Sequence, residues 1–170
     1  MDIEFFEAQE GCQICRLLRS TPENDYVVAQ STCWRITLAP DQFYLGRCYV
    51  TSLRHVPHLS QFSMLEWMDL QAVIRELEAA AVHRLGATHV TWAALMNNAY
   101  QLDDPQPHVH WHVRPRYVAP TTVGDVEMVD AEFGHHHARD LERELQPYQM
   151  ADIASRLRTS LPPDWWSTFR

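Results

Sequence analysis

The chain has 170 residues, of which 46% are apolar, enough for one sizeable core in a single domain. Its formal net charge is −8, from 22 acidic and 14 basic residues, which argues against extended nucleic acid as a partner. The sequence contains no window of 18 uncharged apolar residues, as a transmembrane helix would need, and no N-terminal signal peptide with a basic segment before an apolar run. We therefore expect no membrane association and a cytoplasmic location.

Strand and helix signals follow one another along the first half of the chain. Residues 26–38 predict two short strands that meet near Gln30 and Ser31, and residues 47–53 predict a third. Ser63 and Glu66 then form a capping box that predicts the start of a long helix, which Gly86 would end. The expected buried stripe of this helix consists of Trp67, Leu70, Ile74, Leu77, Ala81 and Leu85.

The second half continues with residues 88–95 as a strand, residues 97–107 as a polar loop and residues 108–114 as a final strand. Residues 118–146 resemble an arm or long loop, and Pro147 predicts a last helix. Trp165 and Trp166 are expected to dock on the body or on a second subunit. We therefore predict an α+β fold with a mainly antiparallel sheet of about five strands, one long helix and a C-terminal helical extension.

The segment from His108 to Arg114 has the pattern H-x-H-x-H. Because side chains alternate along a strand, His108, His110 and His112 would share one face, opposite an apolar face that packs on the core. Three interpretations are possible: a solvated strand face, a three-histidine metal centre, or a catalytic site with three separate roles. In the last, one imidazole attacks a substrate, one is held by a partner group and one donates a hydrogen bond to charge on the substrate.

This string resembles the signature of the histidine triad (HIT) superfamily, in which histidines alternate with apolar residues, although Arg114 replaces the last apolar residue. Residues 47–58 also resemble the family strand that ends in a basic segment and a histidine. The likeness extends from Cys12 to Tyr117 and implies a HIT-like catalytic domain at residues 1–117. Residues 118–170 would be an arm and a helix packing on the same domain.

The resemblance implies that His110 is the nucleophile that attacks the α-phosphorus of a nucleotide, oriented by a nearby backbone carbonyl. His112 would donate a hydrogen bond to a phosphate oxygen or the leaving group, and Asn97 would hold a substrate oxygen. The expected activity is a nucleotide hydrolase or nucleotidyltransferase that cleaves phosphoanhydride or phosphoramidate bonds. Alternatives are a non-catalytic nucleotide-binding or scaffold module of the same fold, or a three-histidine metalloenzyme. A homodimer is compatible with the family.

Cys12 and Cys15 form a C-x-x-C pair, which favours metal binding or redox chemistry over a structural disulfide in a reducing compartment. Zinc-containing HIT relatives join such a pair to a mid-chain histidine and the first motif histidine. The resemblance therefore implies a closed structural zinc site of Cys12, Cys15, His55 and His108, with His58 as a weaker alternative. No organic cofactor is expected. The run from His135 to His137 is a less convincing metal cluster.

The sequence departs from the family pattern at two places. Ala39 stands where many members have a residue that binds the ribose, and Asp41 is displaced from that position. Asp103 and Asp104 precede the triad and would repel a polyphosphate unless they are screened or turned away. The possible counter-charges are Arg47, Arg54, Arg114 and Arg116.

Overall fold

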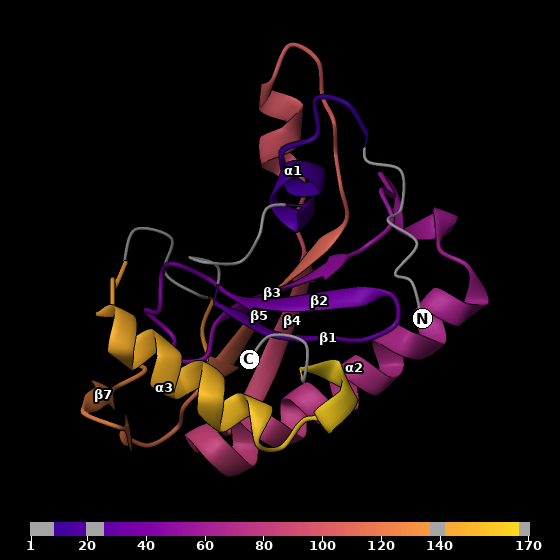
Figure 1. Ribbon diagram of the computed structural model, residues 1–170. Helices are drawn as coiled ribbons and strands as arrows, with labels where there is room; N and C mark the ends of the chain where they lie inside the picture. The colour runs from indigo at the N-terminus through magenta and orange to yellow at the C-terminus, as the bar shows by residue number, and fades with distance from the viewer. Residues whose placement is uncertain (1–8, 20–25, 137–141, 167–170) are drawn as a thin grey trace.

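The computed structural model describes residues 9–19, 26–136 and 142–166 (Figure 1). Within these ranges a five-stranded sheet has the order β1-β2-β3-β5-β4, and a separate hairpin follows it. The elements are α1 (Gln13–Arg19), β1 (Val27–Gln30), β2 (Trp34–Leu38), β3 (Cys48–Ser52), η1 (Leu59–Gln61), α2 (Met64–Leu85), β4 (His89–Ala94), η2 (Asn97–Gln101), β5 (His110–Arg116), β6 (Thr121–Val123), β7 (Val126–Met128), α3 (Pro147–Arg158) and η3 (Pro163–Trp165).

Every neighbouring pair of strands in the large sheet is antiparallel, which confirms the predicted fold class. β5 lies between β3 and β4, and its register sets His110 opposite Thr51 and His112 opposite Tyr49. The histidine-bearing strand is therefore held by backbone hydrogen bonds on both sides. Such a position restricts the motion of its side chains far more than a loop would.

Alternation along the strands gives the sheet two different faces. One face is buried and apolar, with β2 and β3 each following a strict buried-to-intermediate pattern. Trp34, Ile36, Val50, Val109 and Val113 contribute to this core. The opposite face carries the half-buried polar side chains of the same strands, and it is the face on which the site described below is built.

α2 and α3 lie beside each other and cover the apolar face of the sheet (Figure 1). The predicted capping box of α2 is present, since Ser63 and Glu66 exchange hydrogen bonds, and Gly86 ends the helix at φ 75°. One predicted core residue is wrong: Trp67 is 38% exposed and packs its ring edge on Phe62 at 5.6 Å. Glu66 is buried instead because Arg54 pairs with it.

The C-terminal part differs from the prediction in detail. The strand expected at residues 108–114 runs two residues further along the chain, and residues 118–146 contain the β6–β7 hairpin rather than only an arm. The predicted helix begins at Pro147, and Met150, Ile153 and Leu157 are buried on one face. Trp165 and Trp166 pack against the core, as expected for docking on the body.

Helix α3 contacts α2 and β1, so the C-terminal region packs on the sheet domain. The proposed division at Tyr117 and the homodimer stay predictions. None of the helices in the described ranges is both long and apolar enough to cross a bilayer.

Candidate active site

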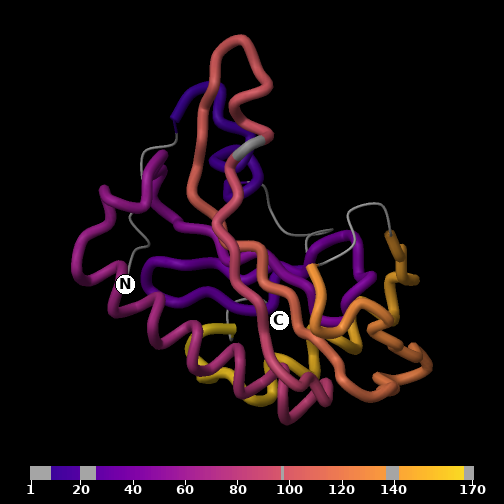
Figure 2. The backbone as a smooth tube through the Cα atoms, turned by 180° about the vertical axis from the view of Figure 1, so that it is seen from behind, coloured from indigo at the N-terminus to yellow at the C-terminus, as the bar shows by residue number. Residues whose placement is uncertain are grey.

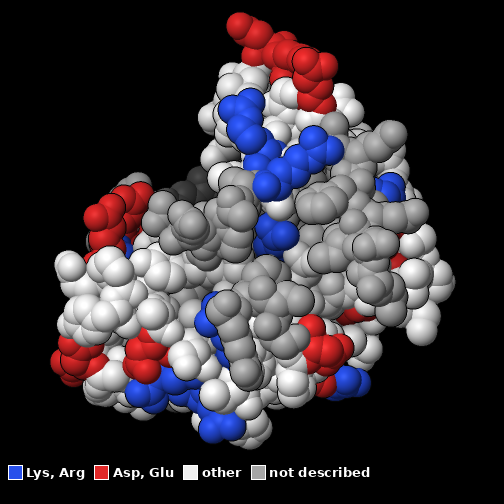
Figure 3. Space-filling model, viewed as in Figure 1, with Lys and Arg blue, Asp and Glu red and all other residues white. Residues whose placement is uncertain are grey.

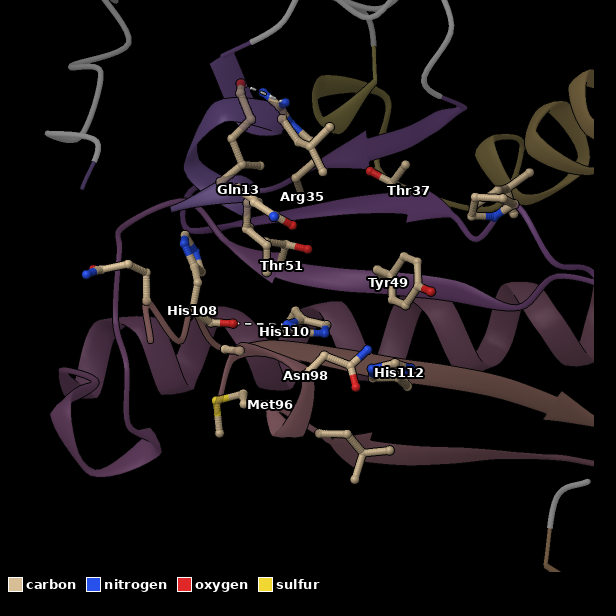
Figure 4. A pocket seen from close by; sticks show the side chains of 18 of the residues that line it. Gln13, Arg35, Thr37, Tyr49, Thr51, Met96, Asn98, His108, His110 and His112 are labelled. Atoms are coloured by element: carbon tan, nitrogen blue, oxygen red, sulfur yellow. Dashed lines mark hydrogen bonds between the residues drawn. The ribbon is translucent and has the colours of Figure 1, made fainter. Parts of the chain in front are cut away.

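The polar face of the sheet forms the floor of a pocket of about 750 Å³. α1 borders it on one side, and the segment from Leu95 to Leu102 borders it on another; Figure 2 shows the chain after β4 rising beside α1. Figure 4 shows His110, His112, Asn98, Tyr49 and Thr51 around the same space. The walls mix apolar side chains with a few polar groups, as small-molecule sites commonly do.

His110 has one ring nitrogen committed to the backbone. Its Nδ1 lies 2.9 Å from the carbonyl oxygen of His108 (Figure 4). A carbonyl only accepts, so Nδ1 must carry a hydrogen, and a ring that carries this one hydrogen has its lone pair on Nε2. The ring is half-buried and lines the pocket, which leaves Nε2 as a nucleophile or acceptor for a bound ligand.

His112 lies beside His110, with ring centroids 5.0 Å apart. Tyr49 packs its ring edge-on against both imidazoles, at 5.9 Å from His110 and 5.1 Å from His112. Burial lowers the pKa of His112 to about 4, and the nearby charges of His110, Arg114 and Arg47 act in the same direction. His112 is therefore neutral at physiological pH and can donate only one ring hydrogen.

Asn97 begins η2 directly after Met96, but its side chain lies outside the part of the chain that the structure describes. The next residue, Asn98, lines the pocket. Figure 4 shows the Asn98 amide close to the imidazole of His112. Sequence reasoning passed over Asn98, although the Asn97–Asn98 doublet in a polar loop was a usable signal.

Cys12, Cys15, His55 and His108 form a cysteine–histidine cluster whose ligand atoms all lie within 4.8 Å of one another. The sulfur of Cys15 is 3.4 Å from Nδ1 of both His55 and His108, and the sulfur of Cys12 is 3.6 Å from Nδ1 of His108. Around a tetrahedral zinc ion, sulfur and nitrogen ligands are separated by about 3.5 Å. The cluster therefore has the chemistry and spacing of a closed Cys₂His₂ site. His58 is exposed and does not belong to it.

The hydrogen bonding of His108 also suits a metal ligand. Its Nε2 lies 2.8 Å from the carbonyl oxygen of Ser52, so this nitrogen carries the hydrogen and Nδ1 keeps its lone pair toward the cysteines. The carbonyl oxygen of the same residue accepts from His110. One residue thus links the cysteine–histidine cluster to the pocket.

The three motif histidines do not act as one row. His108 precedes β5, is 2% exposed and directs its Nδ1 at the cysteines at the border of the pocket, whereas His110 and His112 line the pocket and do not belong to the cluster. Among the described residues, the group that could hold a metal includes His108 but neither His110 nor His112. This geometry does not favour a three-histidine metal centre. His135 and His136 are exposed, and His137 lies outside the described residues.

Three of the four candidate counter-charges already have carboxylate partners. Arg47 pairs with Asp41, Arg54 with Glu66 and Arg116 with Asp130. Arg114 instead contacts His112, with 3.4 Å between its Nη2 and the imidazole Nδ1. The carboxylate of Asp41 is thus occupied by its ion pair with Arg47. Ala39 is buried and has no polar side-chain atom, so neither residue offers a free ligand for a ribose.

The predicted repulsion by Asp103 and Asp104 is limited by their placement. Both are exposed, and neither is among the described residues that line the pocket. Figure 3 shows acidic side chains gathered at the tip of the molecule above α1, with basic side chains below them. The carboxylates are therefore turned toward solvent, where water and salt screen them.

Comparison with solved structures shows the fold. A histidine triad protein from Sinorhizobium meliloti 1021 superposes with a TM-score of 0.65 at 15% identity, over 94% of this chain and 100% of that one. A zinc-bound histidine triad family protein from Mycobacterium smegmatis gives 0.56 at 18%, over 88% and 92%. The diadenosine triphosphate hydrolase of Plasmodium falciparum, in complex with cyclomarin A, gives 0.53 at 12%, over 83% and 86%.

No family model matches the sequence, and no curated protein matches it either. The likeness therefore lies in the three-dimensional arrangement: this chain has the fold of histidine triad proteins.

Proposed function

We propose that the protein is a nucleotide hydrolase or nucleotidyltransferase that works through a covalent nucleotidyl-His110 intermediate. The observation that carries the proposal is the hydrogen bond from His110 Nδ1 to the His108 carbonyl oxygen, which leaves Nε2 free at the pocket. A solved neighbour of the same fold is a diadenosine triphosphate hydrolase, which supports the same class of substrate.

The reaction has two displacements at one phosphorus. The lone pair of His110 Nε2 attacks the α-phosphorus, a nitrogen–phosphorus bond forms, and the leaving group departs with the electron pair of its bond to phosphorus. Water or another acceptor then attacks the phosphorus, loses a proton, and returns the electron pair of the nitrogen–phosphorus bond to Nε2. Splitting one displacement into two lowers the barrier of each, and the pocket holds the reacting groups in position.

The His108 carbonyl would stabilise the covalent intermediate, because the nucleotidylated imidazole ring is cationic and its Nδ1–H donates a stronger hydrogen bond. His112 would donate its ring hydrogen to a phosphate oxygen or to the departing group, where negative charge develops. Asn97 is proposed to hold a substrate oxygen, and Asn98, which lines the pocket, is a further candidate for the same role.

We also propose that the cysteine–histidine cluster holds a structural zinc ion. With four protein ligands the site would be closed, so the ion would supply folding energy and rigidity rather than an activated water. Because His108 belongs to the cluster and also accepts from His110, its fixed position would orient the nucleophile. The zinc-bound neighbour of the same fold is consistent with this role.

The decisive experiment screens the purified protein against adenylated and guanylated compounds, including dinucleoside polyphosphates and nucleoside phosphoramidates. The wild type should turn over at least one of them, and rapid quenching should trap a nucleotide adduct on His110, located by mass spectrometry. His110→Ala should lose activity by a factor of about 10³ or more, whereas His136→Ala, which changes an exposed histidine, should retain it.

Full turnover by His110→Ala would overturn the covalent mechanism. Nucleotide binding without turnover, retained by the same variant, would instead identify a non-catalytic nucleotide-binding module. Zinc content measured on the protein as purified tests the cluster independently of either activity.

A further inference from the structure

Arg114 continues the alternation that sets His110 and His112 on one face of β5. It lies two residues after His112 on β5, so its side chain emerges on the same face of the sheet as those of His110 and His112. This is also the position at which the sequence departs from the alternation of histidine and apolar residues. An apolar side chain would pack there without charge, yet this chain has an arginine that is only 5% exposed.

The guanidinium of Arg114 is buried without a carboxylate of its own. Asp41 pairs with Arg47 and Asp130 pairs with Arg116, and no described carboxylate forms an ion pair with Arg114. Its Nη1 is buried and has no hydrogen-bond partner among the described residues. Burying a cation in this way is costly, so the contacts that it does make are worth explaining.

The contact that the structure gives it is with a site histidine. Nη2 of Arg114 lies 3.4 Å from Nδ1 of His112. A guanidinium has only donors, so Nδ1 must be the acceptor, and the hydrogen of the neutral ring must sit on Nε2. The opposite tautomer would place two hydrogens between these nitrogens.

We propose that Arg114 is a positioning residue that fixes His112 in the Nε2–H tautomer, so that His112 presents a donor to the phosphate or leaving group. The role in turnover rests on the proposed function, whereas the tautomer is a property of the free protein. The arrangement resembles the carbonyl that orients His110, but the direction is reversed: an acceptor fixes the first imidazole and a donor fixes the second.

Most of the groups around His112 oppose a second hydrogen on its ring. The groups that face it are His110 and Arg114 on its own strand, Arg47 and Tyr49 from the β3 side, and the carbonyl of Leu95 after β4. Burial is the largest cause that keeps the pKa of His112 low, and the two guanidinium groups oppose a second proton on the ring. The Leu95 carbonyl acts the other way: it accepts a hydrogen bond from the ring and raises the pKa, but it is the smallest of these causes.

The test uses nitrogen-15 NMR of histidine-labelled full-length protein, with His112 assigned by its loss in His112→Gln. In the wild type, His112 should show an unprotonated Nδ1 and a protonated Nε2 between about pH 6 and 8. In Arg114→Met the titration midpoint of His112 should rise, and the Nδ1–H or doubly protonated form should become populated. Arg114→Lys retains a cationic donor and should stay closer to the wild type.

Arg54→Met is the matched control, since it removes a guanidinium that pairs with Glu66 and not with His112. It should leave the His112 signals unchanged. With a substrate found by the screen, Arg114→Met should lower kcat by about 10- to 100-fold, the usual cost of losing a partner that orients a functional histidine, with a smaller change in KM.

A wild-type His112 that carries its hydrogen on Nδ1 would overturn the inference, even if Arg114→Met failed to fold. An Arg114→Met protein with the tautomer and midpoint of the wild type would overturn it as well. Neither result would affect nucleotide trapping on His110. Conversely, absence of the His110 adduct would refute the proposed function but would not change the tautomer assigned to His112.

Discussion

Gly46 enters β3 from a tight loop, and we predict that alanine at this position destabilises the protein strongly. Its φ is +78°, in the left-handed region that side chains with a β-carbon avoid. A β-carbon there would lie 2.4 Å from Cδ1 of Leu85 and 3.4 Å from Cγ of Pro115. Leu85 is 1% exposed at the end of α2, and Pro115 is buried on β5, so neither can easily move.

The cost has two parts. Holding alanine in the left-handed region costs about 1–2 kcal/mol, and forcing an extra carbon into a packed core costs about 1–3 kcal/mol. The expected loss in the free energy of unfolding is therefore about 2–5 kcal/mol. For a chain of this size, a loss of about 3 kcal/mol corresponds to a fall in Tm of about 6–12 °C.

Gly134→Ala provides the matched control. Gly134 also has a positive φ, +84°, but no atom lies within 4 Å of its prospective β-carbon. Only the backbone cost of about 1–2 kcal/mol should apply. Urea denaturation and thermal melting of both variants measure the difference. Equal losses in the two variants would refute the argument that Leu85 and Pro115 leave no room beside Gly46.

Three further predictions concern metal, pH and charge. Removing metal with a chelator should lower Tm and abolish turnover together, as followed by calorimetry and zinc analysis; an unchanged Tm would contradict a structural ion. Burial raises the pKa of Glu66, but hydrogen bonds from Arg54 and Ser63 outweigh it and lower the pKa below 4.5. The stability that this carboxylate contributes is thus fully present above pH 4.5 and is lost as the pH falls through the lowered value. Urea titrations of Glu66→Gln should therefore show a loss of about 1 kcal/mol at pH 7 that becomes smaller as the pH is lowered below 4.5; a loss that stays constant with pH would count against it. Asp130→Asn should cost about 3–5 kcal/mol, because Arg116 would be left buried without its carboxylate, and a loss under about 1 kcal/mol would disprove the pairing.

Much of the architecture could be predicted because its signals are local. The hydrogen bonds between Ser63 and Glu66 join residues three apart, and Gly86 ends the helix through its own backbone conformation. The alternation around His110 and His112 sets their common face through the pleat of a single strand. These features depend only on residues close together in the sequence, so they can be predicted without knowledge of the tertiary packing.

Other features arise from contacts between distant parts of the chain. Trp67 fits the helical period of the core but is partly exposed, whereas the neighbouring Glu66, which pairs with Arg54, is buried. No spacing rule could have shown this, since burial depends on what the rest of the chain presents to each helical position.

The sequence by itself determined that His110 and His112 would share a face and that Cys12 and Cys15 would lie close together. The family resemblance implied that His108 joins the cysteines, and the structure places it beside Cys15, 93 residues away, but only the tertiary structure decided that Arg114 donates to His112. The physical reason is that periodicity sets the direction of a side chain from its own backbone, whereas its hydrogen-bond partner depends on which other segments the fold brings within reach.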